Sequence, residues 1–439
     1  MFLGAATMGA RRVMMRMLTA AGLLAGTVTG VGAQPASQTL TLQDCIRRAE
    51  SAPSLFSLAR QEREIASNGL TQARAGLLPQ TRLVNGFTYN SPLLYNREVF
   101  SHLPLNGIRE YASLLSVSQE LDTSGRLRAE LARARAAQAV AATSVALTQR
   151  DLRRAVTAAY YRALLTRRIA GIVASVLEES RDFETRVRAL FQAGEAAQAD
   201  VVKASAQVAS LQQAVNAAGL EARLAGQELA SFWTTDVDGE LALADVLDTQ
   251  PPPPEPEAAQ PSPYLRRLEF TVLDSQKRGF QADLKRARSA LLPQLGVFFQ
   301  YGIDSTGVRI ADRGYAAFVN LTIPIFDWNQ AQSAVRQARL RTQQVESARA
   351  IAERTFSKEY QGALARVRQL YEQISLAGRQ AALAEEDLRM SRIRYEGGEG
   401  SALDVVTAQN QLAQARSNYF AALAGYWNAT ADLEVASGR

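Results

Sequence analysis

The sequence of 439 residues contains a single cysteine, Cys45, and a single histidine, His102. One cysteine excludes an intrachain disulfide, and we expect Cys45 to be a small buried residue of the first helix. One histidine, in a segment that we expect to form an external loop, leaves no imidazole-based metal site. The G-x-S-x-G, H-E-x-x-H and Walker-type motifs are absent as well. These absences predict a protein that is not an enzyme and that holds no catalytic residue, cofactor or metal ion.

The body of the chain also lacks a run of about 18 apolar residues, the length that a membrane-spanning helix needs. The N-terminal segment differs, because three arginines precede an apolar run that ends at the small-residue site Val31-Gly32-Ala33. This order is typical of a secretory signal peptide over residues 1–33, and a membrane anchor is the alternative. The formal net charge is +6. Removing the three arginines with the leader leaves too little positive charge to predict nucleic-acid binding.

Three pairs of short segments recur in the same order at a nearly constant spacing, which indicates an internal duplication. The pairs are Leu77-Leu78-Pro79-Gln80 with Leu291-Leu292-Pro293-Gln294, Leu121-Asp122 with Phe326-Asp327, and Ala193-Gly194-Glu195 with Gly397-Gly398-Glu399. A proline-rich stretch at 251–263 separates the copies and is typical of a stiff linker. We therefore expect a first repeat over 34–250 and a second over 264–439, with a longer loop around 93–108 in the first.

The sequence of each copy predicts three helices. The first helix covers 40–76 in one copy and 262–291 in the other, and it ends before Pro79 or Pro293 because proline stops a helix. A long segment without proline follows, at 124–192 and at 329–396. At 1.5 Å per residue, each of these helices would be roughly 100 Å long. Return helices are expected over 196–232 and 401–436, so that each copy ends in a long helical hairpin.

Between the first and the long helix, each copy has two runs in which apolar and polar residues alternate. The apolar positions are Leu83, Phe87, Tyr89, Tyr111, Leu115, Val117, Leu295, Val297, Phe299, Tyr301, Ile303, Tyr315, Ala317, Val319, Leu321 and Ile323. Alternation over about ten residues with aromatic residues near the ends is typical of outer-membrane strands. An ordinary half-buried hairpin of a soluble domain is the alternative, because the pattern of each single strand is weak.

Four membrane strands cannot close a barrel alone, and lipid does not tolerate open sheet edges. Two chains would supply eight strands, whose interior side chains would fill. Three chains would supply twelve strands, which leave a lumen, and twelve long helices to continue it. The predicted fold is an α+β membrane protein: a trimeric 12-stranded β-barrel, four strands per chain, continued by a long periplasmic α-helical barrel.

On these residues the chain resembles the TolC-like outer-membrane efflux family. The resemblance is carried by Leu40-Thr41-Leu42, both Leu-Pro-Gln segments, Ser118-Gln119-Glu120-Leu121-Asp122 with Gly125, Ile323-Pro324-Ile325-Phe326-Asp327, and the two tips where a glycine precedes an aspartate. It covers essentially all of the chain after the leader. The run Ile323-Pro324-Ile325-Phe326-Asp327-Trp328-Asn329-Gln330 is slightly more similar to the heavy-metal cation branch than to the drug branch.

The resemblance implies a homotrimer in the outer-membrane lipid of a Gram-negative bacterium, with helices extending into the periplasm. It implies a passive conduit for small solutes, metal cations or drugs, which docks with a periplasmic adaptor and an inner-membrane pump of RND or ABC type. An outer-membrane duct for type I protein secretion is one alternative. A periplasmic coiled-coil scaffold or adaptor is another, although the strands and the duplication argue against it.

The same resemblance implies roles for residues at the two hairpin tips. Gly194, Glu195, Gly398 and Glu399 would form the periplasmic entrance and contact the adaptor. Glycine provides the backbone freedom that a tight reversal needs.

Four further residues match gate positions of the family. Asp404 would form a ring of three carboxylates that attracts cations, whereas Thr407 stands where the family often has a second aspartate. The alternative for Asp404 is a helix cap, because Ser401 to Asp404 is also a capping box. Tyr395 and Asp200 would hydrogen-bond between hairpins in the closed state. Asp200 otherwise only complements a helix N-terminus.

Overall fold

The computed structural model describes residues 39–92, 107–239, 241–254 and 262–438. Residues 40–439 belong to one compact unit. The predicted signal peptide at 1–33, His102 with most of its predicted loop, and positions 255–261 of the predicted linker lie outside the described residues.

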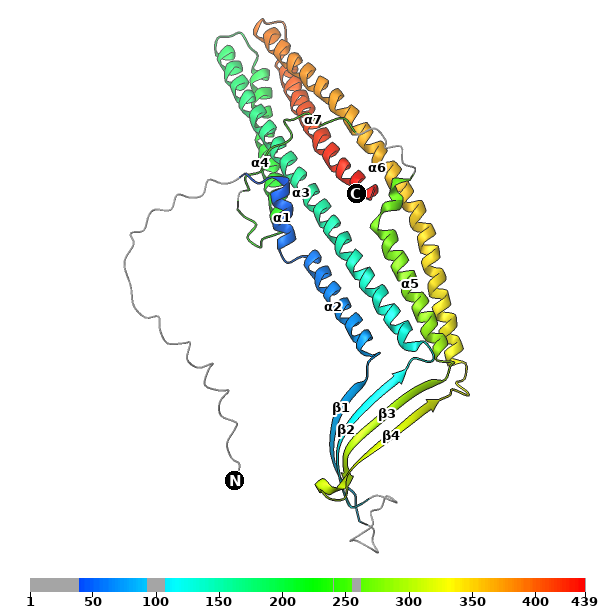
Figure 1. The fold of residues 1–439 in the computed structure, drawn as a ribbon. Helices are drawn as coiled ribbons and strands as arrows, with labels where there is room; N and C mark the ends of the chain where they lie inside the picture. The colour runs from blue at the N-terminus through cyan, green and yellow to red at the C-terminus, as the bar shows by residue number, and fades with distance from the viewer. Residues whose placement is uncertain (1–38, 93–106, 240, 255–261, 439) are drawn as a thin grey trace, which may run out of the picture. The chain divides into compact units, whose positions relative to one another are not determined.

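A similar order of helices and strands occurs twice along the chain (Figure 1). The first copy consists of α1 (Leu42–Ser51), α2 (Leu55–Ala75), β1 (Gln80–Tyr89), β2 (Arg109–Leu121), α3 (Arg126–Gln192) and α4 (Gln198–Ala230). The second consists of η1 (Pro263–Arg266), α5 (Leu268–Ser289), β3 (Gln294–Ser305), η2 (Ile310–Asp312), β4 (Arg313–Thr322), α6 (Gln330–Glu396) and α7 (Ala402–Ala436). Helices α3 and α6 each have 67 residues, about 100 Å. In the part of the chain that the structure describes, none of the helices has an apolar stretch able to cross a bilayer.

The first helix of each copy differs from the expectation. The helix expected over 40–76 is divided into α1 and α2, because Pro53 lies between them. Its preceding residue, Ala52, has an extended backbone with ψ 157°, the conformation that a following proline favours. In the second copy, Ser262 has a left-handed backbone and Pro263 opens a short 3₁₀ turn, so that α5 begins only at Leu268.

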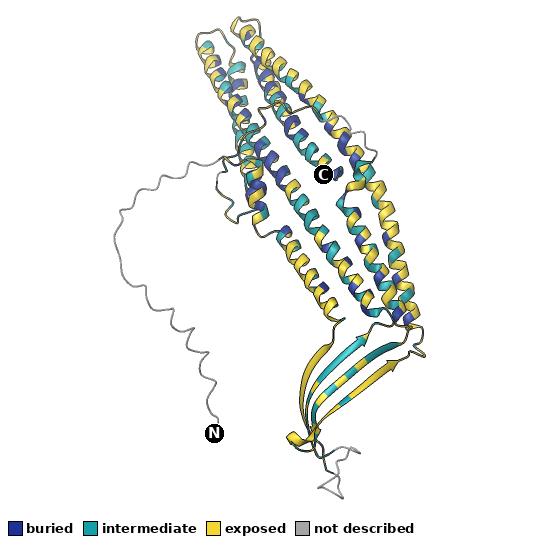
Figure 2. Cartoon of the chain, viewed as in Figure 1, coloured by how far each residue is buried: buried dark blue, intermediate teal, exposed yellow. Residues whose placement is uncertain are grey.

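The four strands form one antiparallel sheet in the order β1-β2-β3-β4. The registers place the predicted apolar residues on one face, except Ile323, which follows the end of β4; Leu115, Tyr301 and Tyr315, for example, are successive partners on β2, β3 and β4. The other face is less polar than expected, because Phe298 and Phe318 pair on it with ring centroids 4.6 Å apart. The strands carry intermediate and exposed residues only (Figure 2).

Strands β1 and β4 are the edges of this sheet. Within the described residues each pairs with one neighbouring strand only. Every residue of β1 is exposed, and so is nearly every residue of β4. A strand edge presents backbone N–H and C=O groups that can pair with another chain.

Two aspartates that mark the repeat in the sequence begin the two long helices. The Asp122 carboxylate accepts hydrogen bonds from the backbone nitrogens of Leu127 and Arg128, at 2.9 and 3.1 Å. The Asp327 carboxylate accepts from those of Asn329 and Ala331, at 3.1 and 2.8 Å. Each aspartate thus satisfies amides that a helix start leaves without an intrahelical partner. The duplicated motif therefore has a structural cause: it connects a strand to a 67-residue helix.

The largest hydrophobic core surrounds the middle of α3 and also contains residues of α1, α4, α6 and α7. Cys45 is fully buried in this core and is a free thiol, as predicted. The buried Tyr160 donates its hydroxyl to the carbonyl oxygen of Ala244 at 2.6 Å. This bond fixes the segment that follows α4 against α3. Because alanine has a small side chain, the many alanines of these helices allow close packing.

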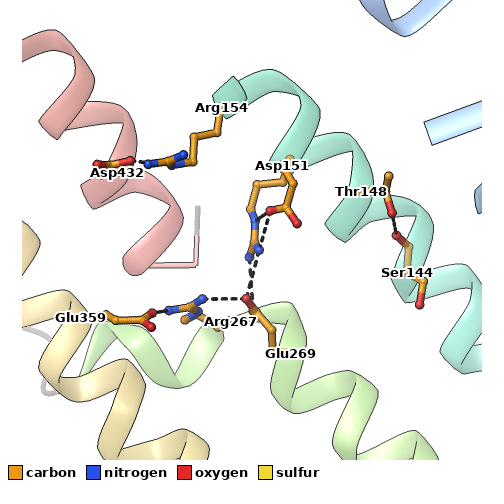
Figure 3. Close-up of polar contacts among 9 residues, drawn as sticks. Ser144, Thr148, Asp151, Arg154, Arg267, Glu269, Glu359 and Asp432 are labelled. Atoms are coloured by element: carbon orange, nitrogen blue, oxygen red, sulfur yellow. Dashed lines mark hydrogen bonds and ion pairs between the residues drawn. The ribbon is translucent and has the colours of Figure 1, made fainter. Parts of the chain in front are cut away.

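A network of ion pairs joins α3, the start of α5 and α6, and a separate pair joins α3 to α7 (Figure 3). Arg267, whose side chain is 8% exposed, bonds Glu269 at 2.7 Å and Glu359 at 2.5 Å. Arg150 of α3 reaches the same Glu269 with two bonds, at 3.0 and 3.2 Å. The Arg267 guanidinium also lies 3.7 Å from the centroid of the Phe356 ring. The start of the second copy is thereby attached to both long helices.

Glu269 is the shared acceptor of this network. Burial alone would raise its pKa, but the hydrogen bonds from Arg267 and Arg150 outweigh burial and lower the pKa from 4.5 to about 2. Because the folded pKa lies below the ordinary value, the network's stabilisation is fully present above about pH 4.5. It is lost as the pH falls toward 2.

We predict that Glu269→Gln lowers the free energy of unfolding at neutral pH by about 1–3 kcal/mol, because two arginines lose a charged acceptor. Between about pH 4.5 and pH 2, the free energy of unfolding should also fall less in the variant than in the wild type. Denaturant unfolding followed by circular dichroism over this pH range measures both effects. Glu353→Gln on the exposed surface of α6 is the control. If the free energy of unfolding changed with pH in the same way in the wild type and in Glu269→Gln, the role of Glu269 would be contradicted.

Candidate functional site

Each helical hairpin reverses at a tip of a few residues, between α3 and α4 and between α6 and α7. Gly194 has φ 82° and Gly398 has φ 75°, a left-handed conformation that glycine adopts without strain. The amides of Glu195 and Glu399 each donate to a carbonyl oxygen five residues earlier, at 2.9 Å. Together with a second bond from each glycine amide, this is the Schellman arrangement that ends a helix. All four predicted tip residues are exposed, as contact with a partner requires.

The two tips differ in how the return helix begins. Ser401 caps α7: its hydroxyl accepts from the Asp404 amide at 3.3 Å, and the Asp404 carboxylate accepts from the Ser401 amide at 3.0 Å. Helix α4 begins after Ala197, which makes no side-chain cap. The predicted capping box is therefore present at the second tip alone. The carboxylate ring stays a prediction.

Asp404 stays exposed to solvent although it caps a helix. The hydrogen bond from the Ser401 amide lowers the pKa of Asp404, and the positive charges of Arg394 and Lys203 lower it further. The residue is exposed, and so is Thr407 on the same helix. Asp404 therefore presents an ionised carboxylate to solvent beside the tip.

Tyr395 lies inside the bundle rather than on its surface. It is 8% exposed, and its ring meets Phe183 of α3 edge to face with centroids 5.1 Å apart. Its hydroxyl is buried and has no hydrogen-bond partner among the described residues. Burial, and to a lesser degree the charge of Asp200, raises the pKa of Tyr395. The structure thus brings Asp200 into the electrostatic range of Tyr395 without a hydrogen bond between them.

Two ion pairs that the sequence did not suggest connect the hairpins near the tips. Arg392 of α6 bonds Glu179 of α3 at 2.7 Å, and Arg186 of α3 bonds Glu396 of α6 at 3.0 Å. They border a cavity of about 60 Å³ that Tyr395 also lines. The partners are more than 200 positions apart in a chain rich in arginine and glutamate, so no local pattern distinguishes them. We name these two pairs the inter-hairpin pairs.

The tips offer no set of ligands for a bound metal ion or cofactor. Within the described ranges, no three or more His, Cys, Asp or Glu side chains gather to form a metal site. The only cysteine, Cys45, is buried in the core around α3.

The chain matches known proteins over most of its length. A family model described as outer membrane efflux protein matches residues 48–234 and 265–439, one stretch within each of the two copies. The cobalt-zinc-cadmium resistance protein CzcC of Cupriavidus metallidurans is 25% identical over 411 residues, which cover 91% of this chain and 90% of CzcC. A membrane protein from Pseudomonas aeruginosa has a TM-score of 0.81 at 19% identity and covers 90% of this chain and 92% of its own. The open state of the Neisseria gonorrhoeae MtrE outer membrane channel has a TM-score of 0.78 at 21% identity, with coverages of 90% and 88%.

We predict that Gly398→Ala loosens the second tip, because a side chain in the left-handed region costs about 1–2 kcal/mol. Amide hydrogen exchange at Glu399 and Gly400, which both donate to Arg394, should become roughly 5- to 30-fold faster. Gly397→Ala is the matched control, because Gly397 has a right-handed backbone with φ −81°. Equal exchange rates in the two variants would show that the left-handed residue does not hold the tip.

Proposed function

Because the chain belongs to the outer membrane efflux protein family, it is an efflux channel component of the outer membrane and not an enzyme, and we propose that three copies form one conduit. Each copy contributes the four-stranded sheet to a 12-stranded barrel and its long helices to a periplasmic helical barrel. The observation that carries this proposal is the open sheet with exposed edges β1 and β4. A sheet in lipid needs every edge paired, and three sheets of four strands enclose a lumen.

The conduit works within a tripartite export system. The exposed tips at Gly194, Glu195, Gly398 and Glu399 face the periplasm and dock with an adaptor. An inner-membrane pump of RND or ABC type supplies the energy, since the chain offers no nucleotide-binding motif of its own. A passive channel requires only a polar path and a gate.

Divalent metal cations are the solutes that we favour. The relative CzcC is named as a cobalt-zinc-cadmium resistance protein, and its similarity extends over 91% of this chain. An exposed, ionised Asp404 on each of three chains would attract such cations to the entrance. Drugs and secreted proteins are the competing cargoes of helical ducts. Removal of the gene separates metal cations, drugs and secreted proteins as cargoes.

Closure of the entrance is held by contacts between the two hairpins. The inter-hairpin pairs fasten α3 to α6, and opening has to break them if the hairpins separate. Tyr395 lies beside them, and its hydroxyl, which has no partner among the described residues, donates a hydrogen bond to Asp200 in the closed trimer. Asp404 then tunes which ions enter.

The cargo is tested by removing the gene for this chain and restoring it on a plasmid. We expect tolerance to cobalt, zinc and cadmium to fall on removal and to return on restoration. Tolerance to lipophilic drugs and the amount of secreted protein should not change. A loss confined to drug tolerance or to protein secretion would contradict the metal assignment.

The role of Asp404 is tested by two variants that separate charge from capping. Asp404→Asn keeps an oxygen that can accept the Ser401 amide but removes the charge, whereas Ser401→Ala removes the hydroxyl cap and keeps the charge. In planar bilayers, block by calcium should weaken in Asp404→Asn and persist in Ser401→Ala. Thermal stability should fall in Ser401→Ala, by about 1 kcal/mol for a lost cap. If calcium blocked the Asp404→Asn channel as strongly as the wild-type channel, Asp404 would be a helix cap only.

A further inference from the structure

A second charged site lies far from the tips, where the helices meet the sheet. A cavity of about 510 Å³ opens there between the first turns of α3 and α6 and the last turns of α5. Four arginines line it: Arg126, Arg133, Arg286 and Arg341. They face two acidic residues, Glu130 and Asp283, so that the lining has an excess of positive charge.

The acidic groups at this cavity already have partners. Glu130 pairs with Arg126 at 2.8 Å, and Asp283 pairs with Arg133 at 3.2 Å. Arg286 and Arg341 are exposed and form no ion pair with any described residue. Two guanidinium groups from different helices therefore face one cavity without a negative partner.

The position of the cavity points to the kind of anion. Arg286 lies within the last turn of α5, about 5 Å from the helix end, and β3 begins shortly after that helix. The polar headgroup layer of a bilayer extends roughly 5–8 Å beyond the hydrocarbon on each side. If the strands cross the hydrocarbon, the cavity lies at the depth of the headgroups of the periplasmic leaflet.

We propose that this cavity binds the phosphate of an anionic phospholipid headgroup. A guanidinium donates paired hydrogen bonds that match the oxygens of a phosphate, and basic pockets at the membrane surface hold such headgroups. Arg286 and Arg341 bind the phosphate, while Arg126 and Arg133, held by their acidic partners, shape the wall. A bound lipid fixes the junction of helices and sheet at the membrane surface. Free phosphate has the same chemistry and is the other source of this anion.

The test compares two double variants of the full-length protein in detergent. Arg286→Gln with Arg341→Gln removes both unpaired guanidinium groups. Arg288→Gln with Arg339→Gln is the matched control, because these exposed arginines lie on the same helices at a similar depth but do not line the cavity. Native mass spectrometry then measures binding of phosphatidylglycerol, of phosphatidylcholine and of inorganic phosphate to each protein.

We expect phosphatidylglycerol to bind the wild type and the control more tightly than phosphatidylcholine does. The cavity variant should bind it about thirtyfold more weakly, since each basic residue near an anionic membrane surface contributes about a fivefold factor. An equal loss in both double variants, or no loss in the cavity variant, would overturn the site. Cavity-dependent binding of inorganic phosphate without binding of phosphatidylglycerol would overturn the lipid as its ligand.

Discussion

The two unpaired edges of the sheet impose the requirement on which the rest of the structure depends. Four strands in the order β1-β2-β3-β4 leave β1 and β4 each with one neighbour within the described chain. The protein resides in the outer membrane, where lipid cannot satisfy the hydrogen bonds of a strand edge. In the proposed conduit these edges pair with those of other copies. The long helices are tied to the sheet, because Asp122 and Asp327 begin α3 and α6 shortly after β2 and β4 end.

The duplication gives the two copies the same long helices and strands, and the copies differ at their hairpin tips. At the second tip Ser401 caps the return helix and Tyr395 is buried against Phe183. At the first tip Ala197 makes no side-chain cap, and the residue that corresponds to Tyr395 by the repeat spacing is Phe191, which is exposed. Near the second tip an aromatic side chain thus packs into the bundle, whereas near the first tip an aromatic side chain is exposed to solvent. The inter-hairpin pairs then couple the two unequal hairpins.

Much of this fold could be predicted from the sequence because its signals are local. Segments without proline became helices α3 and α6 with bounds close to those expected, and alternation gave the apolar face of the sheet. The family membership inferred from the repeated motifs is confirmed. The division at Pro53 is a local signal that was missed. The pairing of Phe298 with Phe318 depends on register between strands, which alternation within one strand does not specify.

The candidate site was predicted less completely, for a physical reason. The Ser401–Asp404 box is a contact over three positions and was visible in the sequence. The pairs Arg392–Glu179 and Arg186–Glu396 depend on how two distant helices pack, so no spacing rule locates them. The hydrogen bond expected between Tyr395 and Asp200 stays a prediction, because it was expected for the closed state of the family and the Tyr395 hydroxyl has no partner among the described residues.

Cross-linking of the sheet edges tests the proposed trimer most directly. With Cys45 replaced by alanine, Leu83→Cys on β1 is combined in turn with Tyr315→Cys, Ala317→Cys, Val319→Cys or Leu321→Cys on β4, all on the same face. Since β1 and β4 are opposite edges of one sheet, a disulfide between them has to join two chains. Oxidation of outer membranes should give covalent products of two and three chains, and nothing larger, for the pair in register. A panel that yields single chains only, or a ladder that continues beyond three chains, would contradict a closed conduit of three copies.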